Sequence, residues 1–182
     1  IRGRKDYNSY IIVRTESPLR KGEDLEGGSF AFTDPLSLSG HLYPHWFLLE
    51  QGRDPGTFFK RTVLSYSHDA SIRAVKKGIV DAASVDSLIY DQEVARDREI
   101  GTVLRIIHTS PPLPFAPVVT PASLDPAVRS RIAAALISMH EDPEGREILA
   151  KMNVDRFVAP DPPNLDFAIE VHERVGRYLR TR

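Results

Sequence analysis

The stretch FAFTDPLSLSGHLYP, residues Phe30 to Pro44, decides the fold because it joins an expected strand to an expected helix. The apolar run FAFT has the composition of a buried strand. The Asp-Pro pair that follows is typical of a turn. Leu42, Trp46 and Leu49 then recur at helical spacing within about residues 39–51. A strand that leads through a turn into a helix is the basic unit of an α/β fold.

The turn places Ser37, Ser39 and Gly40 where this helix begins. The first N–H groups of a helix lack partners within it, and the macrodipole adds about half a positive charge there. Serine hydroxyls add hydrogen-bond donors, and glycine lets the backbone approach a ligand closely. The turn therefore predicts a site for a small anion. The alternative is that Ser37 or Ser39 only caps the helix, a role for which serine is favoured.

Strands and helices continue to alternate along the chain. The patterns predict strands near residues 10–17, 62–67, 81–86 and 102–110, and a helix over 68–78 with Ile72, Val75 and Ile79 facing inward. Two helices are expected within 123–152, the first with an apolar stripe, and a closing helix over 164–180. The stripe consists of Leu124, Val128, Ile132, Ala135 and Met139. This order predicts an α/β protein with a mostly parallel sheet, which binds ligands at the carboxyl ends of its strands.

The composition excludes several classes of partner and chemistry. The 24 Lys and Arg residues against 25 acidic ones give a net charge of -1, which provides no basic surface for nucleic acid. No apolar run approaches the roughly 18 residues that span a bilayer. The chain has no cysteine, which excludes disulfides, thiolate metal sites and a cysteine nucleophile. Lack of cysteine suits an extracytoplasmic protein, although cytosolic proteins can lack it too.

Four motifs follow one another in a characteristic order: DPLSLSGHLYP, GRDPGTFF, SHDASIRAVKKGIVDAASVDS and IIHTSPPLPFAPVV. This series, which covers nearly the whole chain, resembles the substrate-binding proteins of phosphate, phosphite and phosphonate ABC transporters. The resemblance implies the fold of a type II periplasmic binding protein, with two α/β lobes joined by a hinge.

The domain organisation follows from the same resemblance. Residues 10–108 would form the complete second lobe, which binds the anion. Residues 1–9 and 109–182 would form the hinge crossover and the C-terminal part of an incomplete first lobe. The sequence begins without Met and is shorter than members of the family. We therefore expect it to be part of a longer protein, with an apolar face exposed on its C-terminal helices.

The resemblance also implies six ligand-binding residues, which are Tyr7, Ser37, Ser39, Gly40, His41 and His68. The two serines, the glycine and the amide of His41 would surround the phosphoryl oxygens. His68 would donate one further hydrogen bond, and Tyr7 would line the cleft near the hinge. The alternative for His68 is a surface histidine at a helix start, and for Tyr7 simple packing.

Two departures from the family bear on the ligand. Leu38 stands where the family often has threonine, so one hydroxyl donor is missing. Leu88 and Ala116 are apolar where members that bind aminoalkyl phosphonates carry carboxylates, and Asp86 lies near them in the sequence. We therefore expect a ligand without an amine, such as phosphate, phosphite or an alkyl phosphonate.

The resemblance implies a solute-binding protein that captures this oxyanion for uptake through an ABC-transporter permease. It would work without a cofactor, in the periplasm or another extracytoplasmic space, either free or tethered to the membrane. The alternative is a ligand-sensing domain of the same fold that passes its signal to a receptor output module.

Some residue patterns could also suit an enzyme or a metal site. Ser39, His68 and Asp69 could form a hydrolytic triad, but Asp69 adjoins His68 and cannot readily orient it. The chain also lacks the G-x-S-x-G motif. His41 and His45 have the i, i+4 spacing of metal ligands, but no H-E-x-x-H motif or cysteine supports them. The sequence therefore predicts neither catalysis nor a bound metal.

Overall fold

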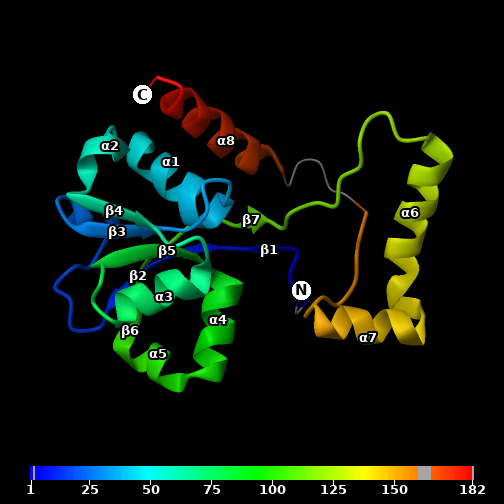
Figure 1. Cartoon of the computed structure of the whole chain (residues 1–182), viewed down its shortest axis with the longest axis horizontal. Coiled ribbons are helices and arrows are strands. Elements are labelled where there is room, and N and C mark those ends of the chain that lie inside the picture. Colours follow the sequence, from blue (N-terminus) through cyan, green and yellow to red (C-terminus); the bar gives the residue numbers. More distant parts are fainter. Residues whose placement is uncertain (2, 160–164, 182) are drawn as a thin grey trace. The chain divides into compact units, whose positions relative to one another are not determined.

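The computed structural model describes residues 1, 3–159 and 165–181 and divides the chain into two compact units (Figure 1). The sheet unit comprises Tyr7–Leu113 with Asp166–Arg182, and the small unit comprises Ile1–Asp6 with Pro114–Leu165. None of the helices in the described part of the chain is long and apolar enough to cross a membrane.

The sheet unit is built on a five-stranded sheet with the order β4-β3-β5-β2-β6. The strands are β2 (Ser9–Arg14), β3 (Ser29–Phe32), β4 (Arg61–Leu64), β5 (Ala82–Asp86) and β6 (Leu104–Thr109). β3 pairs in parallel with β4 and β5, whereas β2 is antiparallel to both β5 and β6. Four strands therefore run in one direction, as expected of a mostly parallel sheet, and β2 runs against them. Two short strands, β1 (Asp6–Tyr7) and β7 (Leu113–Pro114), pair with each other.

Helices cover both faces of this sheet (Figure 1). One face carries η2 (Leu38–Leu42), α1 (Tyr43–Glu50), α2 (Pro55–Phe58) and α8 (Asp166–Leu179). The other carries α3 (His68–Lys76), α4 (Ser87–Arg96) and α5 (Arg98–Val103). A short 3-10 helix, η1 (Gly22–Leu25), precedes β3.

The alternation of side chains along β2 separates two hydrophobic cores. Ile11 packs with Phe30 and Leu48 on the α1 face, and Ile12 packs with Ile72 and Val75 on the α3 face. Adjacent strand residues point to opposite faces, so a two-sided sheet needs continuous apolar runs of this kind.

The expected inward position of Ile79 is wrong, because this side chain is 53% exposed. Helix α3 ends at Lys76, and Gly78 with φ 67° turns the chain before Ile79. Helical spacing therefore no longer applies to this residue.

The small unit contains α6 (Pro126–Ser138), η3 (Met139–Glu141) and α7 (Pro143–Lys151). Asp142 caps α7, since its side chain accepts a hydrogen bond from Gly145 N at 2.7 Å. Helix α6 buries none of its residues, and Val128 and Ile132 on the expected stripe are 40% and 39% exposed. The expected apolar face is therefore present and open.

The closing helix α8 belongs to the sheet unit, whereas the sequence predicted that it belongs to the first lobe. Residue 164, the expected start of this helix, lies outside the described residues. The Phe167 ring meets Trp46 edge-on with 5.0 Å between ring centroids. Near the other end of α8, the Tyr178 hydroxyl donates to Asp54 Oδ1 at 2.6 Å. These contacts hold α8 against the α1 face.

Candidate anion-binding site

A pocket of 340 Å³ lies in the sheet unit, where β3 and β4 end. The carboxyl ends of parallel strands are the usual place for ligands in an α/β sheet. The residues that line it are Thr33, Asp34, Ser37, Tyr66, Ser67, His68, Asp69 and Ile89. The pocket therefore brings together two of the predicted residues, Ser37 and His68.

Ser37 is held by the turn that follows β3. Its amide donates to Asp34 O at 2.9 Å, and its hydroxyl oxygen accepts from Gly40 N at 3.0 Å. It thereby caps η2, a single π-helical turn of a kind frequent at functional sites. Because the cap uses the oxygen as an acceptor, the hydroxyl proton can still be donated to a ligand. Capping and ligand binding are compatible at this residue.

Gly40 serves close packing in this structure. A Cβ at residue 40 would lie 2.8 Å from Thr33 Cβ and closer still to the Thr33 hydroxyl. The Gly40 amide already donates to Ser37 Oγ, and the His41 amide donates to Ser37 O at 3.1 Å. Neither residue is among those that line the pocket. This differs from the expectation that both bind the ligand directly.

Ser39 is a residue of η2 and is buried, with 1% of its surface exposed. Its carbonyl oxygen accepts hydrogen bonds from Ser9 Oγ at 2.7 Å and from Ser84 Oγ at 2.8 Å. These hydroxyls come from β2 and β5, so they fasten the turn to the sheet. Ser39 therefore anchors the site from below and does not line it.

Tyr7 meets Ser39 from the start of the sheet unit. Burial raises the pKa of the Tyr7 hydroxyl to about 12, a hydrogen bond with the Ser39 side chain lowers it, and the charge of Asp86 raises it. Tyr7 is 8% exposed and does not line the pocket. In this structure it supports the turn.

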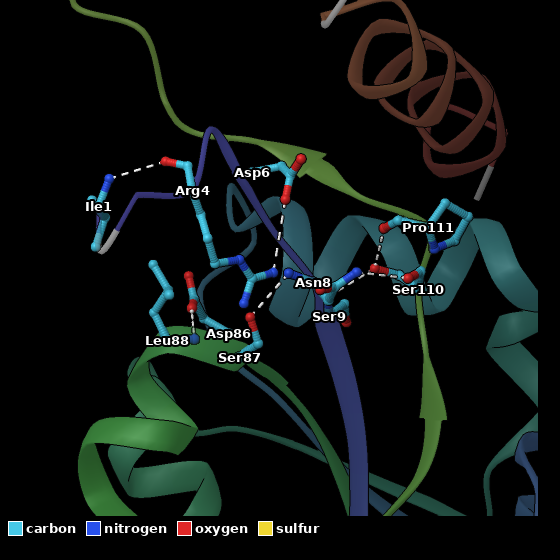
Figure 2. A network of polar contacts seen from close by, with 10 residues as sticks. All are labelled: Ile1, Arg4, Asp6, Asn8, Ser9, Asp86, Ser87, Leu88, Ser110 and Pro111. Atoms are coloured by element: carbon cyan, nitrogen blue, oxygen red, sulfur yellow. Dashed lines mark hydrogen bonds and ion pairs between the residues drawn. The ribbon is translucent and has the colours of Figure 1, made fainter. Parts of the chain in front are cut away.

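The start of β2 is fixed by polar contacts to the neighbouring strand ends (Figure 2). Asn8 N donates to Ser87 Oγ at 3.0 Å, and Asn8 Nδ2 donates to Ser110 O at 2.9 Å. Ser9 N donates to Ser110 Oγ at 2.8 Å. This network holds Ser9 in place, and Ser9 in turn holds the turn that carries Ser37.

His68 is the first residue of α3. Its Nδ1 accepts a hydrogen bond from Asp86 N at 3.0 Å, at the end of β5. Burial lowers the pKa of His68 to about 4, against an opposing effect of the Asp69 charge. The ring is therefore neutral at pH 7, and its proton resides on Nε2. His68, which lines the pocket, thus carries an uncharged N–H donor on a ring held by the Asp86 amide.

The polar groups that line the pocket carry no positive charge. No Lys or Arg is among the described residues that line it. Asp69 is paired with Arg73 at 2.7 Å, and its pKa is lowered by hydrogen bonds from Ser67 and Arg73. The amides of α3 that precede Ala70, whose own N–H donates to Ser67 Oγ, would add to the Ser37 and His68 donors. An anion would be held by dipoles and neutral donors.

The catalytic and metal alternatives lack the required geometry. Ser39 Oγ is hydrogen-bonded to Tyr7, and His68 Nδ1 is taken by a backbone amide, so Asp69 does not orient His68. The His41 and His45 rings stack with 4.4 Å between centroids, and His45 Nδ1 lies 2.7 Å from His41 O. Over residues 1, 3–159 and 165–181, no three His, Cys, Asp or Glu side chains gather as metal ligands.

A family described as the periplasmic substrate-binding protein of phosphonate ABC transporters matches residues 1–165. The chain belongs to this family. The resemblance of the four motifs is therefore confirmed. Within the family, the phosphonates-binding periplasmic protein of Escherichia coli K12 is 27% identical over 161 residues, which are 86% of this chain and 47% of that protein.

A second curated relative is similar to part of the chain and is also named as a binding protein. The probable phosphite-binding protein PhnD1 of Prochlorococcus marinus is 25% identical over 114 residues, which are 59% of this chain and 38% of that protein. The chain thus spans less than half the length of both curated relatives. These relatives are named as binding proteins and not as enzymes or receptors, so the receptor alternative gains no support from them.

Solved structures confirm the fold class of type II periplasmic binding proteins. The binding component of a Pseudomonas aeruginosa phosphonate transporter has a TM-score of 0.82 at 25% identity, over 97% of this chain and 60% of that one. PhnD1 in complex with methylphosphonate has a TM-score of 0.76 at 18% identity, over 94% of this chain and 68% of that one.

Several pocket residues of this family member were not predicted from the sequence: Thr33, Asp34, Tyr66, Ser67, Asp69 and Ile89. Ser67 had a usable signal, because a serine directly before a helical pattern is a typical cap. Its hydroxyl oxygen indeed accepts from Ala70 N at 3.4 Å. Ile89 had no signal in the sequence, since it enters the pocket only through the packing of α4 beside α3.

Proposed function

We propose that this protein captures a small phosphorus oxyanion, namely phosphate, phosphite or an alkyl phosphonate, and delivers it to the membrane permease of an ABC transporter. The observation that carries the proposal is the pocket in which the Ser37 hydroxyl and the neutral His68 ring meet at the ends of β3 and β4. The family description and the names of the relatives support the same ligand class.

The donors of the pocket are sufficient for binding of useful strength. A hydrogen bond to a charged group contributes about 1.5–3 kcal/mol. A micromolar site needs about 8 kcal/mol. Four such donors, drawn from the Ser37 hydroxyl, the His68 N–H and the first amides of α3, would reach this value without a cation.

The ligand is proposed to lack an amine. Leu88 is 9% exposed and apolar, and the carboxylate of Asp86 accepts hydrogen bonds from Leu88 N and Ile89 N at the start of α4. Asp69 is balanced by Arg73. The Asp86 carboxylate is thus used to cap α4, and Leu88 offers no charge to an ammonium group. Methylphosphonate, found in the PhnD1 complex, is a ligand of this kind, with an uncharged carbon group.

The remaining assignments follow from the same proposal. Residues 10–108 would form the anion-binding second lobe, and the segments on either side would form the hinge and part of the first lobe, except α8, which lies in the sheet unit. The protein would act in the periplasm, free or tethered to the membrane, and would release its ligand unchanged without a cofactor.

Calorimetric titration with methylphosphonate, phosphite and inorganic phosphate tests the proposal. We expect at least one of them to bind in the micromolar range. The Ser37→Ala variant should weaken that binding by about 1.5–3 kcal/mol, because one charge-assisted hydrogen bond is lost. Heat of binding with amino acids or sugars only would reject the proposal.

A matched control separates binding from helix capping. Asp142 caps α7 through Gly145 N as Ser37 caps η2 through Gly40 N, three residues on in both cases. The Asp142→Ala variant should lose stability but keep its affinity. Equal affinities for the two alanine variants would show that Ser37 is only a cap.

A further inference from the structure

Tyr66 has a backbone conformation that large residues rarely adopt. Its φ is 64°, and Asn153 with φ 55° is the only other described residue besides glycine with a positive φ. Asparagine tolerates this left-handed region, but a tyrosine there is an outlier. Such outliers cluster at ligand sites, and Tyr66 lines the pocket described above.

The loop around Tyr66 is held in this conformation from both sides. Ser65 N donates to Phe32 O at 2.9 Å at the end of β4. The Ser65 hydroxyl lies 2.9 Å from Ser67 O and 2.7 Å from Ser71 Oγ, which spans Tyr66 and ties the loop to α3. The surrounding structure therefore imposes the strained backbone of Tyr66.

The strained position places an aromatic residue in the lining of the pocket. Tyr66 lines the pocket, and 71% of the residue's surface is exposed. Ile89 on α4 lines the same pocket and adds a second apolar surface. A ligand that covers exposed apolar area gains binding free energy, because that area is removed from water. The polar donors Ser37 and His68 and this apolar pair thus form two chemically different parts of one site.

We propose that Tyr66 and Ile89 hold the carbon substituent of a phosphonate while Ser37 and His68 hold its phosphoryl oxygens. This inference rests on the proposed function and narrows it. The site selects a phosphonate that carries an uncharged carbon group over inorganic phosphate, which has no group to place against the ring.

The test compares ethylphosphonate with inorganic phosphate by calorimetry in the wild-type protein and in Tyr66→Gly. Glycine accepts φ 64° without strain, so this variant should fold at least as stably as the wild type. We expect its preference for ethylphosphonate over phosphate to fall about tenfold, the low end of what a methylene contributes in an apolar pocket.

Three further variants separate the effect of the ring from the effect of the backbone. Tyr66→Phe keeps the ring and should keep the preference. Tyr66→Asn keeps a residue that tolerates the left-handed region and should lose the preference as Tyr66→Gly does. Asn153→Gly relaxes the matching position in the small unit and should leave the preference unchanged.

The outcomes distinguish this inference from the proposed function. If the wild type binds none of ethylphosphonate, methylphosphonate, phosphite and phosphate, the proposed function fails and the inference fails with it. If the wild type binds phosphate at least as tightly as ethylphosphonate, only the inference is overturned. If the wild type binds but Tyr66→Gly keeps the same preference, only the inference is overturned. An equal loss of both ligands in Tyr66→Gly and Tyr66→Asn would also overturn it, because the ring would then serve the anion and not the carbon group.

Discussion

The two loops that line the pocket differ in how their polar groups are used. In the loop after β3, the amides of Ser37, Gly40 and His41 are all engaged within the loop, and Ser39 is fastened to the sheet by two serine hydroxyls. In the segment after β4, His68 at the start of α3 carries its proton on Nε2, and Tyr66 is held in a strained conformation. The first loop supplies a rigid base and the proposed Ser37 donor, and the second supplies the proposed His68 donor and Tyr66. The difference teaches that a serine-rich turn can support a binding site largely from below.

The largest effect on stability and binding is expected in the loop after β3, at Gly40. In Gly40→Ala the new Cβ would overlap the Thr33 side chain, so η2 must move away from β3. We expect a loss of about 1–3 kcal/mol of unfolding free energy, typical of overpacking, together with loss of ligand binding. Urea denaturation and calorimetry measure the two effects.

Gly176→Ala on α8 is the matched control, because the nearest atom to its new Cβ is a flexible Arg180 nitrogen at 3.4 Å. Replacing a helical glycine should leave stability unchanged or raise it by up to about 1 kcal/mol. If Gly40→Ala behaved in the same way, the base would not be tightly packed.

A smaller effect is expected on the pH dependence of stability, through His68 after β4. The pKa of His68 is lowered to about 4 in the folded protein from an ordinary value of 6.5. The unfolded chain therefore binds more protons between these values, so stability falls as the pH drops from 6.5 toward 4. His68→Gln should reduce this fall by at most about 1.4 kcal/mol per pH unit.

Urea denaturation at several pH values between 4 and 7.5 checks this prediction, with His172→Gln as the exposed control. The control should follow the wild type. A His68→Gln variant whose stability falls as steeply as that of the wild type would mean that His68 is not held neutral by burial.

The sequence predicted much of this architecture because the relevant signals are local. Helical spacing, the Asp-Pro turn and the serine caps lie within a few residues of the elements that they define, and Ser37 and His68 both begin helical turns at strand ends. The functional family also followed from motifs that are contiguous in the chain.

The rest depends on contacts between distant segments. Ser39 looks like a ligand-binding serine until Ser9 and Ser84, from two other strands, are placed against its carbonyl group. The close approach of Thr33 to Gly40 and the packing of α8 on α1 depend on tertiary packing in the same way. The left-handed backbone conformation of Tyr66 could not be predicted from the sequence, because tyrosine rarely adopts it.

The central claim is that uncharged donors from the two loops, and no cationic side chain, hold the anion. A crystal structure of the protein with methylphosphonate tests it most directly. We expect phosphoryl oxygens within hydrogen-bond distance of Ser37 Oγ and His68 Nε2. A phosphonate bound elsewhere, or one held in this pocket by a lysine or arginine side chain, would contradict the claim.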